Sequence, residues 1–69
     1  MPVDRLTYMA NQIGRHFISQ AAADPEHRIA DHLRRFWDPS MRKVIIAYVA
    51  KGGSGLLPEV TQAVKLLEP

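Results

Sequence analysis

The chain contains no cysteine, and this absence removes several common ways of stabilising a small protein. Without thiols it can form no disulfide bond and can supply no thiolate ligand to a structural zinc ion or an iron–sulfur cluster. Its 69 residues allow one domain at most, so we expect residues 1–69 to form a single domain. A core of this size contributes roughly 3–5 kcal/mol of net stability, so very close packing or a partner must add to it.

Long apolar runs are also absent. The longest, residues 44–50, lies between two lysines, whereas a membrane-spanning helix needs about 20 apolar residues. Asp4 and Arg5 come early in the chain with no apolar segment behind them, so we expect no signal peptide and a cytoplasmic protein. The net charge of +2 is low for a nucleic-acid-binding protein. The hydrophobic fraction of 46%, however, is that of an ordinary globular protein.

Prolines and glycines mark where helices begin and end. In two Asp-Pro pairs, at 24–25 and 38–39, the aspartate can accept from the free N–H groups of a first helical turn, where proline has no N–H to lose. Pro58 is followed by Glu59, whose carboxylate suits the positive end of a helix dipole. The glycine-rich segment 52–55 before it favours the end of the preceding helix.

Between these marks apolar residues recur at helical spacing, which predicts an all-α fold. We expect a small bundle of four helices, the first long and the last short, joined by tight turns that make neighbouring helices antiparallel. The β-branched run 44–46 would also suit a strand, but the Asp-Pro cap before it and the length of the segment favour a helix. The predicted helices span residues 3–22, 25–37, 39–51 and 58–67. The residues expected to face the core are Leu6, Met9, Ala10, Ile13, Phe17 and Ala21; Ile29, Leu33, Phe36 and Trp37; Met41, Val44, Ile45 and Tyr48; and Val60, Ala63, Val64 and Leu67.

No group of residues predicts catalysis or a bound metal. His27 and Asp31 lie one helical turn apart and could share an ion, but no third ligand has suitable spacing, whereas structural zinc sites have four. The glycines of 52–55 are followed by two leucines instead of the lysine and hydroxyl residue of a phosphate-binding loop. Four short helices leave little room for a cleft that would shift the pKa of a catalytic carboxyl group. We therefore expect the chain by itself to be no enzyme and to bind no cofactor.

A basic cluster surrounds the end of the second predicted helix, in an arrangement that also suits a DNA-binding helix–turn–helix. The third helix would then have to read the bases, but it consists mostly of valine, isoleucine, alanine and tyrosine, with neither asparagine nor glutamine. A solvated face of ion pairs is the simpler interpretation. A nucleic-acid-binding module and a free-standing homodimeric bundle nevertheless stay open as alternatives. The cluster consists of Arg34, Arg35, Arg42 and Lys43 around Trp37.

Some apolar and small residues lie outside the expected core stripes, where a partner could bind. On the first helix Tyr8 and Ile18 lie away from the core, and Gly14 with Ala10 forms a flat strip that another backbone could approach. On the third helix the apolar arc is too wide for one core face, although a central position in the bundle would explain it equally well. The predicted interface residues are Tyr8, Gly14, Ile18, Arg42, Ile46 and Val49.

Three segments in order resemble the delta subunit of bacterial NAD-dependent formate dehydrogenases. They cover most of the chain at the family's spacing, which is more specific than any one of them alone. The segments are residues 8–17 (YMANQIGRHF), residues 29–42 (IADHLRRFWDPSMR), and residues 52–56 (GGSGL) with Val60, Ala63 and Val64 after them.

The resemblance implies membership of a soluble complex that oxidises formate to carbon dioxide and reduces NAD. In such complexes the large subunit carries a molybdenum or tungsten pterin and iron–sulfur clusters, while other subunits carry FMN, the NAD site and a further cluster. The delta subunit is then expected to dock on the large subunit and to support assembly, cofactor insertion or stability. The resemblance carries over no catalytic residue to this chain. The low net charge and the short apolar runs lead us to expect no nucleic-acid and no membrane partner.

Overall fold

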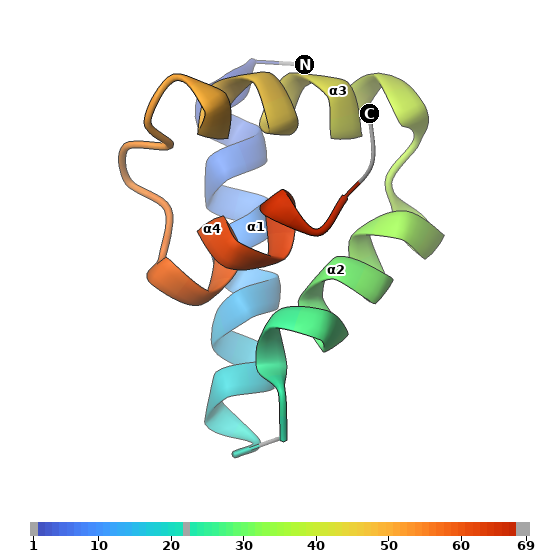
Figure 1. The fold of residues 1–69 in the computed structure, drawn as a ribbon, viewed down its shortest axis with the longest axis vertical. Helices are drawn as coiled ribbons and strands as arrows, with labels where there is room; N and C mark the ends of the chain where they lie inside the picture. The colour runs from blue at the N-terminus through green and yellow to red at the C-terminus, as the bar shows by residue number, and fades with distance from the viewer. Residues whose placement is uncertain (1, 22, 68–69) are drawn as a thin grey trace.

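Helices account for all the regular secondary structure that the computed structural model describes, which covers residues 2–21 and 23–67. The first helix is the longest and the last the shortest, and no strand occurs in these two ranges (Figure 1). The predicted all-α fold of four helices is therefore confirmed. The helices are α1 (Val3–Ser19), α2 (Pro25–Phe36), α3 (Pro39–Ala50) and α4 (Pro58–Lys65).

The helices begin where the prolines predict and end one to three residues earlier than expected. α1 ends at Ser19, and after it Ala21 adopts a positive φ of 52°, which the helix cannot contain. The predicted last residue of this helix, Ala22, lies outside the described residues. α4 ends at Lys65, two residues before the predicted end.

Both Asp-Pro caps form as predicted. Asp38 accepts a hydrogen bond from the backbone N–H of Met41 at 3.0 Å, which satisfies a donor that the first turn of α3 leaves free. Asp24 has a backbone φ of 56°. Its side chain accepts from the backbone N–H of His27 over a longer distance of 3.4 Å. The cap of α3 therefore has the better geometry of the two.

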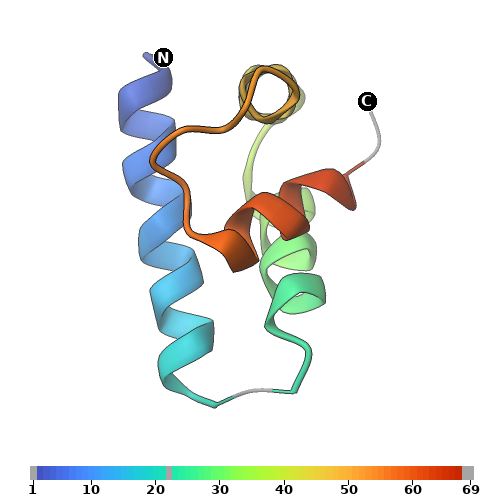
Figure 2. The same ribbon diagram turned by 60° about the vertical axis from the view of Figure 1, so that its left-hand side comes forward.

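The four helices are not all antiparallel, contrary to the prediction. α1 and α2 run side by side in opposite directions, but α3 crosses the N-terminal end of α1, and α4 lies across the middle of the molecule (Figures 1 and 2). Two residues cause the change of direction after α2. Trp37 and Asp38 both have extended backbone, with ψ angles of 137° and 164°, so the chain turns away before α3 begins.

The core lies where α2 packs against α4, with α1 and α3 closing two of its sides. Trp37, at the end of α2, is only 5% exposed and belongs to this core, as predicted. Removing such apolar surface from water is the main source of stability in a chain of this size. The buried apolar side chains are Leu6, Ala10, Ile29, Ala30, Leu33, Trp37, Ile45, Val60, Ala63, Val64 and Leu67.

Phe36 was predicted to face the core, and this is wrong, because its side chain is 71% exposed. The side of α2 that faces the core includes Ala30, and Trp37 directly after the helix is buried as well. This side therefore lies further round the helix axis from Phe36 than the spacing predicted. Ala21 and Val44 are also exposed, the latter at the outer edge of α3. Regular helical spacing identified the side of each helix that faces the core, but it did not show which residues at the border of that side are exposed.

Asn11 is a buried polar residue that fixes the loop before α4. Its amide nitrogen donates to the carbonyl of Gly55 at 2.9 Å, and its side-chain oxygen accepts from the N–H of Leu57 at 3.0 Å. Both polar atoms of the side chain are therefore satisfied, as burial requires. The Tyr48 hydroxyl of α3 also donates to the carbonyl of Ser54 in the same loop, at 2.6 Å. The Asn11 bonds hold the start of α4 against α1, and the Tyr48 bond ties the loop to α3.

Candidate functional site

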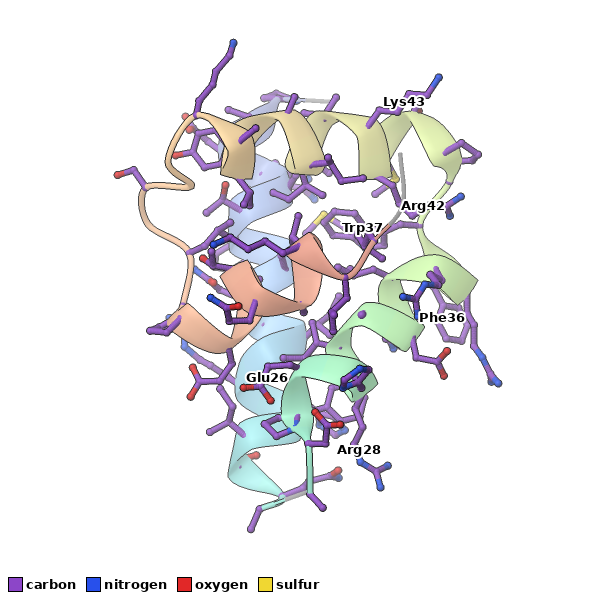
Figure 3. All side chains as sticks on the ribbon, in the orientation of Figure 1. Glu26, Arg28, Phe36, Trp37, Arg42 and Lys43 are labelled. Atoms are coloured by element: carbon purple, nitrogen blue, oxygen red, sulfur yellow. The ribbon has the colours of Figure 1, made fainter. Side chains whose placement is uncertain are left out.

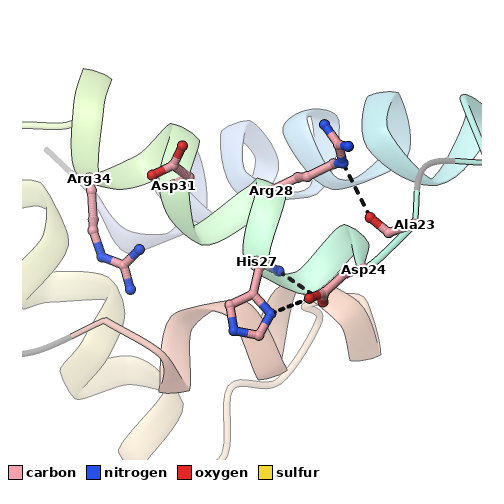
Figure 4. Close-up of a pocket in the computed structure, with 6 residues that line it drawn as sticks. All are labelled: Ala23, Asp24, His27, Arg28, Asp31 and Arg34. Atoms are coloured by element: carbon pink, nitrogen blue, oxygen red, sulfur yellow. Dashed lines mark hydrogen bonds and ion pairs between the residues drawn. The ribbon is translucent and has the colours of Figure 1, made fainter.

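An open depression at the start of α2 gathers several charged side chains (Figure 4). Within it the Nδ1 of His27 lies 2.6 Å from a carboxylate oxygen of Asp24, and Arg28 donates through Nε to the carbonyl of Ala23 at 3.2 Å. The hydrogen bond from the His27 side chain lowers the pKa of the Asp24 carboxyl group. The residues lining the depression are Ala23, Asp24, His27, Arg28, Asp31 and Arg34.

The charged groups of this depression already bind their own chain. Arg34 donates to the carbonyl of Leu66 at 2.9 Å, which ties α2 to the end of α4. Asp31 faces Arg35 on the next turn, at 3.6 Å. Across the part of the chain that the structure describes, no three histidine or acidic residues come close enough to hold a metal ion. The depression is thus a network that supports the start of α2 and its contact with α4.

The glycine-rich segment forms the turn that ends α3. Gly52, Gly53 and Gly55 all have positive φ angles, which L side chains rarely adopt. The N–H of Gly52 donates to the carbonyl of Val49, and that of Gly53 to the carbonyl of Tyr48, at 2.9 and 3.0 Å. These N–H groups therefore satisfy the end of the helix, as the C-cap interpretation predicted.

Of the six predicted interface residues, Tyr8 and Ile18 have exposed side chains, at 59% and 37%. The hydroxyl group of Tyr8 accepts a hydrogen bond from Gln12 at 3.0 Å on the same outer side of α1. Ten residues separate Tyr8 from Ile18, which corresponds to about 15 Å along a helix. The two residues do not form one patch, and their contact with a partner stays a prediction.

The placement of Gly14 on an open strip was wrong. Gly14 is buried, and a Cβ atom at this position would overlap the side chain of Val60 on α4. Leu57 and Ile29 lie 3.6 and 3.8 Å from the same point. The atoms that approach this small residue are side chains of the same chain, and not the backbone of a partner.

Arg42, Ile46 and Val49 are half-buried and contact their own chain. The guanidinium group of Arg42 donates to the backbone carbonyls of Arg34 and Trp37 at the end of α2. Ile46 and Val49 pack against the core, so part of the wide apolar arc of α3 is covered by its own chain, although Ile45 is the only residue of this helix that is fully buried. The structure does not bring these three residues and Tyr8 into a single exposed surface.

The cluster that suggested a helix–turn–helix is only partly free. Arg34 and Arg42 are engaged with backbone carbonyls, and Ser40 at the start of α3 donates to Asp38 at 2.6 Å. This bond is the main reason why the pKa of the Asp38 carboxyl group is lowered. Side chains in such bonds are less available to phosphates or base edges.

An aromatic face that the sequence analysis missed lies between α1 and α2. We use this name for Phe17, His32 and Phe36. The ring centroids of His32 and Phe36 are 4.6 Å apart, and those of Phe17 and His32 are 6.1 Å apart with the rings edge to face. One signal for it was present, because Phe36 and Trp37 are neighbours about 100° apart on a helix and cannot both face one core.

The model of the NADH-dependent formate dehydrogenase delta subunit family, FdsD, matches residues 5–64. This range includes all of α2, α3 and nearly all of α1 and α4. No curated protein and no solved structure matches the chain. The chain belongs to the family of NADH-dependent formate dehydrogenase delta subunits.

Proposed function

We propose that the chain is a non-catalytic accessory subunit of a cytoplasmic NAD-dependent formate dehydrogenase. It docks on the large, molybdenum-containing subunit and supports assembly, cofactor insertion or stability. The family match over residues 5–64 carries this proposal, because it covers nearly the whole helical core.

The chemistry of the chain supports a division of labour within the complex. A chain without cysteine offers no thiolate to an iron–sulfur cluster. On this proposal the molybdenum or tungsten pterin, the iron–sulfur clusters and FMN are held by the other subunits. The delta subunit then contributes binding surface instead of reacting groups.

The small size of the chain also supports a role in an assembly. A domain of 69 residues buries only about 60% of the surface that its unfolded chain exposes, so its own core gives limited stability. Binding to a larger subunit adds stability by mass action. Exposed apolar residues such as Phe36 and Tyr8 are available for that contact.

Removal of the chain from its native host tests the proposal. We expect cells that lack it, but keep the other subunits, to lose most formate-dependent NADH formation and to yield an incomplete or cofactor-poor complex. The wild-type chain supplied in trans should restore both, and an unrelated small helical protein should not. Full activity and a fully loaded complex without the chain would contradict an accessory role.

A further inference from the structure

The aromatic face exposes apolar surface that the fold of the chain does not use. Phe36 is 71% exposed, yet its ring is held in place by the imidazole of His32, which in turn contacts Phe17 of α1. Ring pairs at such distances attract one another, so the contact with His32 favours this orientation of the exposed ring. Figure 3 shows Phe36 projecting from the side of α2, on the opposite side from Trp37.

The same rings line an open groove together with charged side chains of α2. Arg28, Asp31 and Arg35 complete the groove, which therefore holds two guanidinium groups and one carboxylate. The Asp31 carboxylate lies 3.6 Å from Arg35 and leaves Arg28 as the excess positive charge. Burial and the nearby His16 lower the pKa of His32, which favours the neutral form of its ring.

An exposed aromatic ring beside arginines is the composition that protein interfaces favour at their centres. The charge of the groove decides between two possible occupants. In a two-fold dimer of this chain the same patch would meet itself, so two patches of net positive charge would face each other. Like charges brought together oppose association, whereas an acidic partner is attracted.

We propose that the aromatic face docks an acidic segment of another formate dehydrogenase subunit, which inserts an apolar side chain beside Phe36. The inference rests on the proposed function, and it specifies where on this chain the docking occurs. The partner contributes carboxylates toward Arg28 and Arg35, and the inserted side chain covers the exposed ring. The surface differs from the predicted interface, because nine residues place Phe17 and Tyr8 on opposite sides of α1.

Two matched pairs of variants test this in the native host, with an affinity tag on the large subunit and the wild-type chain measured beside them. Phe36→Ala is compared with Val44→Ala, an exposed apolar residue on α3, and Arg35→Glu with Lys43→Glu, an exposed cation on the same helix. The amount of chain recovered per large subunit is measured by quantitative mass spectrometry. Phe36→Ala and Arg35→Glu should each lower it by at least about tenfold, as the loss of an interface hot spot does. Val44→Ala and Lys43→Glu should match the wild type.

A second measurement separates loss of docking from loss of folding. All four isolated variants should keep the helical circular dichroism and melting behaviour of the wild type, since the substituted side chains are exposed. Wild-type recovery by Phe36→Ala and Arg35→Glu would overturn the docking site while leaving the proposed function intact. Failure of the wild-type chain to be recovered would overturn both.

Two further outcomes would place another molecule on the face. A wild-type dimer in solution that Phe36→Ala dissociates would show that a second copy binds there. Tight binding of a single-stranded oligonucleotide, abolished by Phe36→Ala, would show that bases stack on these rings. Either result would overturn the inference of an acidic protein segment.

Discussion

Gly14 lies where α1 packs against Val60 of α4, and its lack of a side chain allows that contact. A Cβ atom there would overlap the side chain of Val60, so Gly14→Ala overpacks the site. Overpacking costs about 1–3 kcal/mol, whereas alanine gains about 1 kcal/mol of helix propensity over glycine. We expect a net loss of up to about 2 kcal/mol in the free energy of unfolding, measured by urea denaturation.

The same substitution in a Val60→Ala background provides the control. Val60→Ala alone should cost roughly 2 kcal/mol, because it removes buried methyl groups. With that space open, Gly14→Ala should become neutral or stabilising, since only the helix propensity is left. If Gly14→Ala is equally harmful in both backgrounds, contact with Val60 does not explain the need for glycine.

At the level of single residues, the sequence showed which positions are unusual. It was less reliable about which residues those positions contact. Gly14 was recognised as a place for close approach, but helical spacing gives a face and not the identity of the chain that covers it. Phe36 and Trp37 were both assigned to the core, and the extended backbone at Trp37 brings only the latter inside. That backbone angle depends on tertiary packing, so the periodicity could not reveal it.

At the scale of the helices, local chemistry predicted the starts well. Asp38 caps α3 through a hydrogen bond within its own turn, so the residues next to it are sufficient to predict the start of this helix. The direction of α3 depends instead on two extended residues and on contacts with distant segments. The same holds for Asn11, whose partners lie more than forty residues away, at Gly55 and Leu57.

Arg42 joins two helices, and its substitution should affect stability. Its guanidinium group donates to carbonyls at the C-terminal end of α2, which have no partner within that helix and carry partial negative charge. We expect Arg42→Ala to lower the free energy of unfolding by about 1–2 kcal/mol in urea denaturation. Lys43→Ala, the exposed neighbour, should change it by less than about 0.5 kcal/mol. Equal effects of the two substitutions would show that the bonds to α2 contribute no stability.

At the scale of the whole molecule, the described chain measures only 29 × 22 × 18 Å. None of its described helices has the length and apolar content needed to cross a bilayer. The open depression at the start of α2 is occupied by groups that bind their own chain, whereas the aromatic face presents an ordered ring to solvent. The aromatic face is therefore the exposed apolar surface on which the docking proposal rests.

The most direct test of this account is the recovery of partners with the chain itself. An affinity-tagged wild-type chain, expressed at its native level and purified from its host, should bring down the large formate dehydrogenase subunit in near-equal molar amount. Intact-mass measurement of the eluted complex gives that ratio, and a tagged unrelated helical protein serves as the control. Recovery of the chain alone, or only as a dimer with itself, would contradict the conclusion that it works as a subunit of the dehydrogenase.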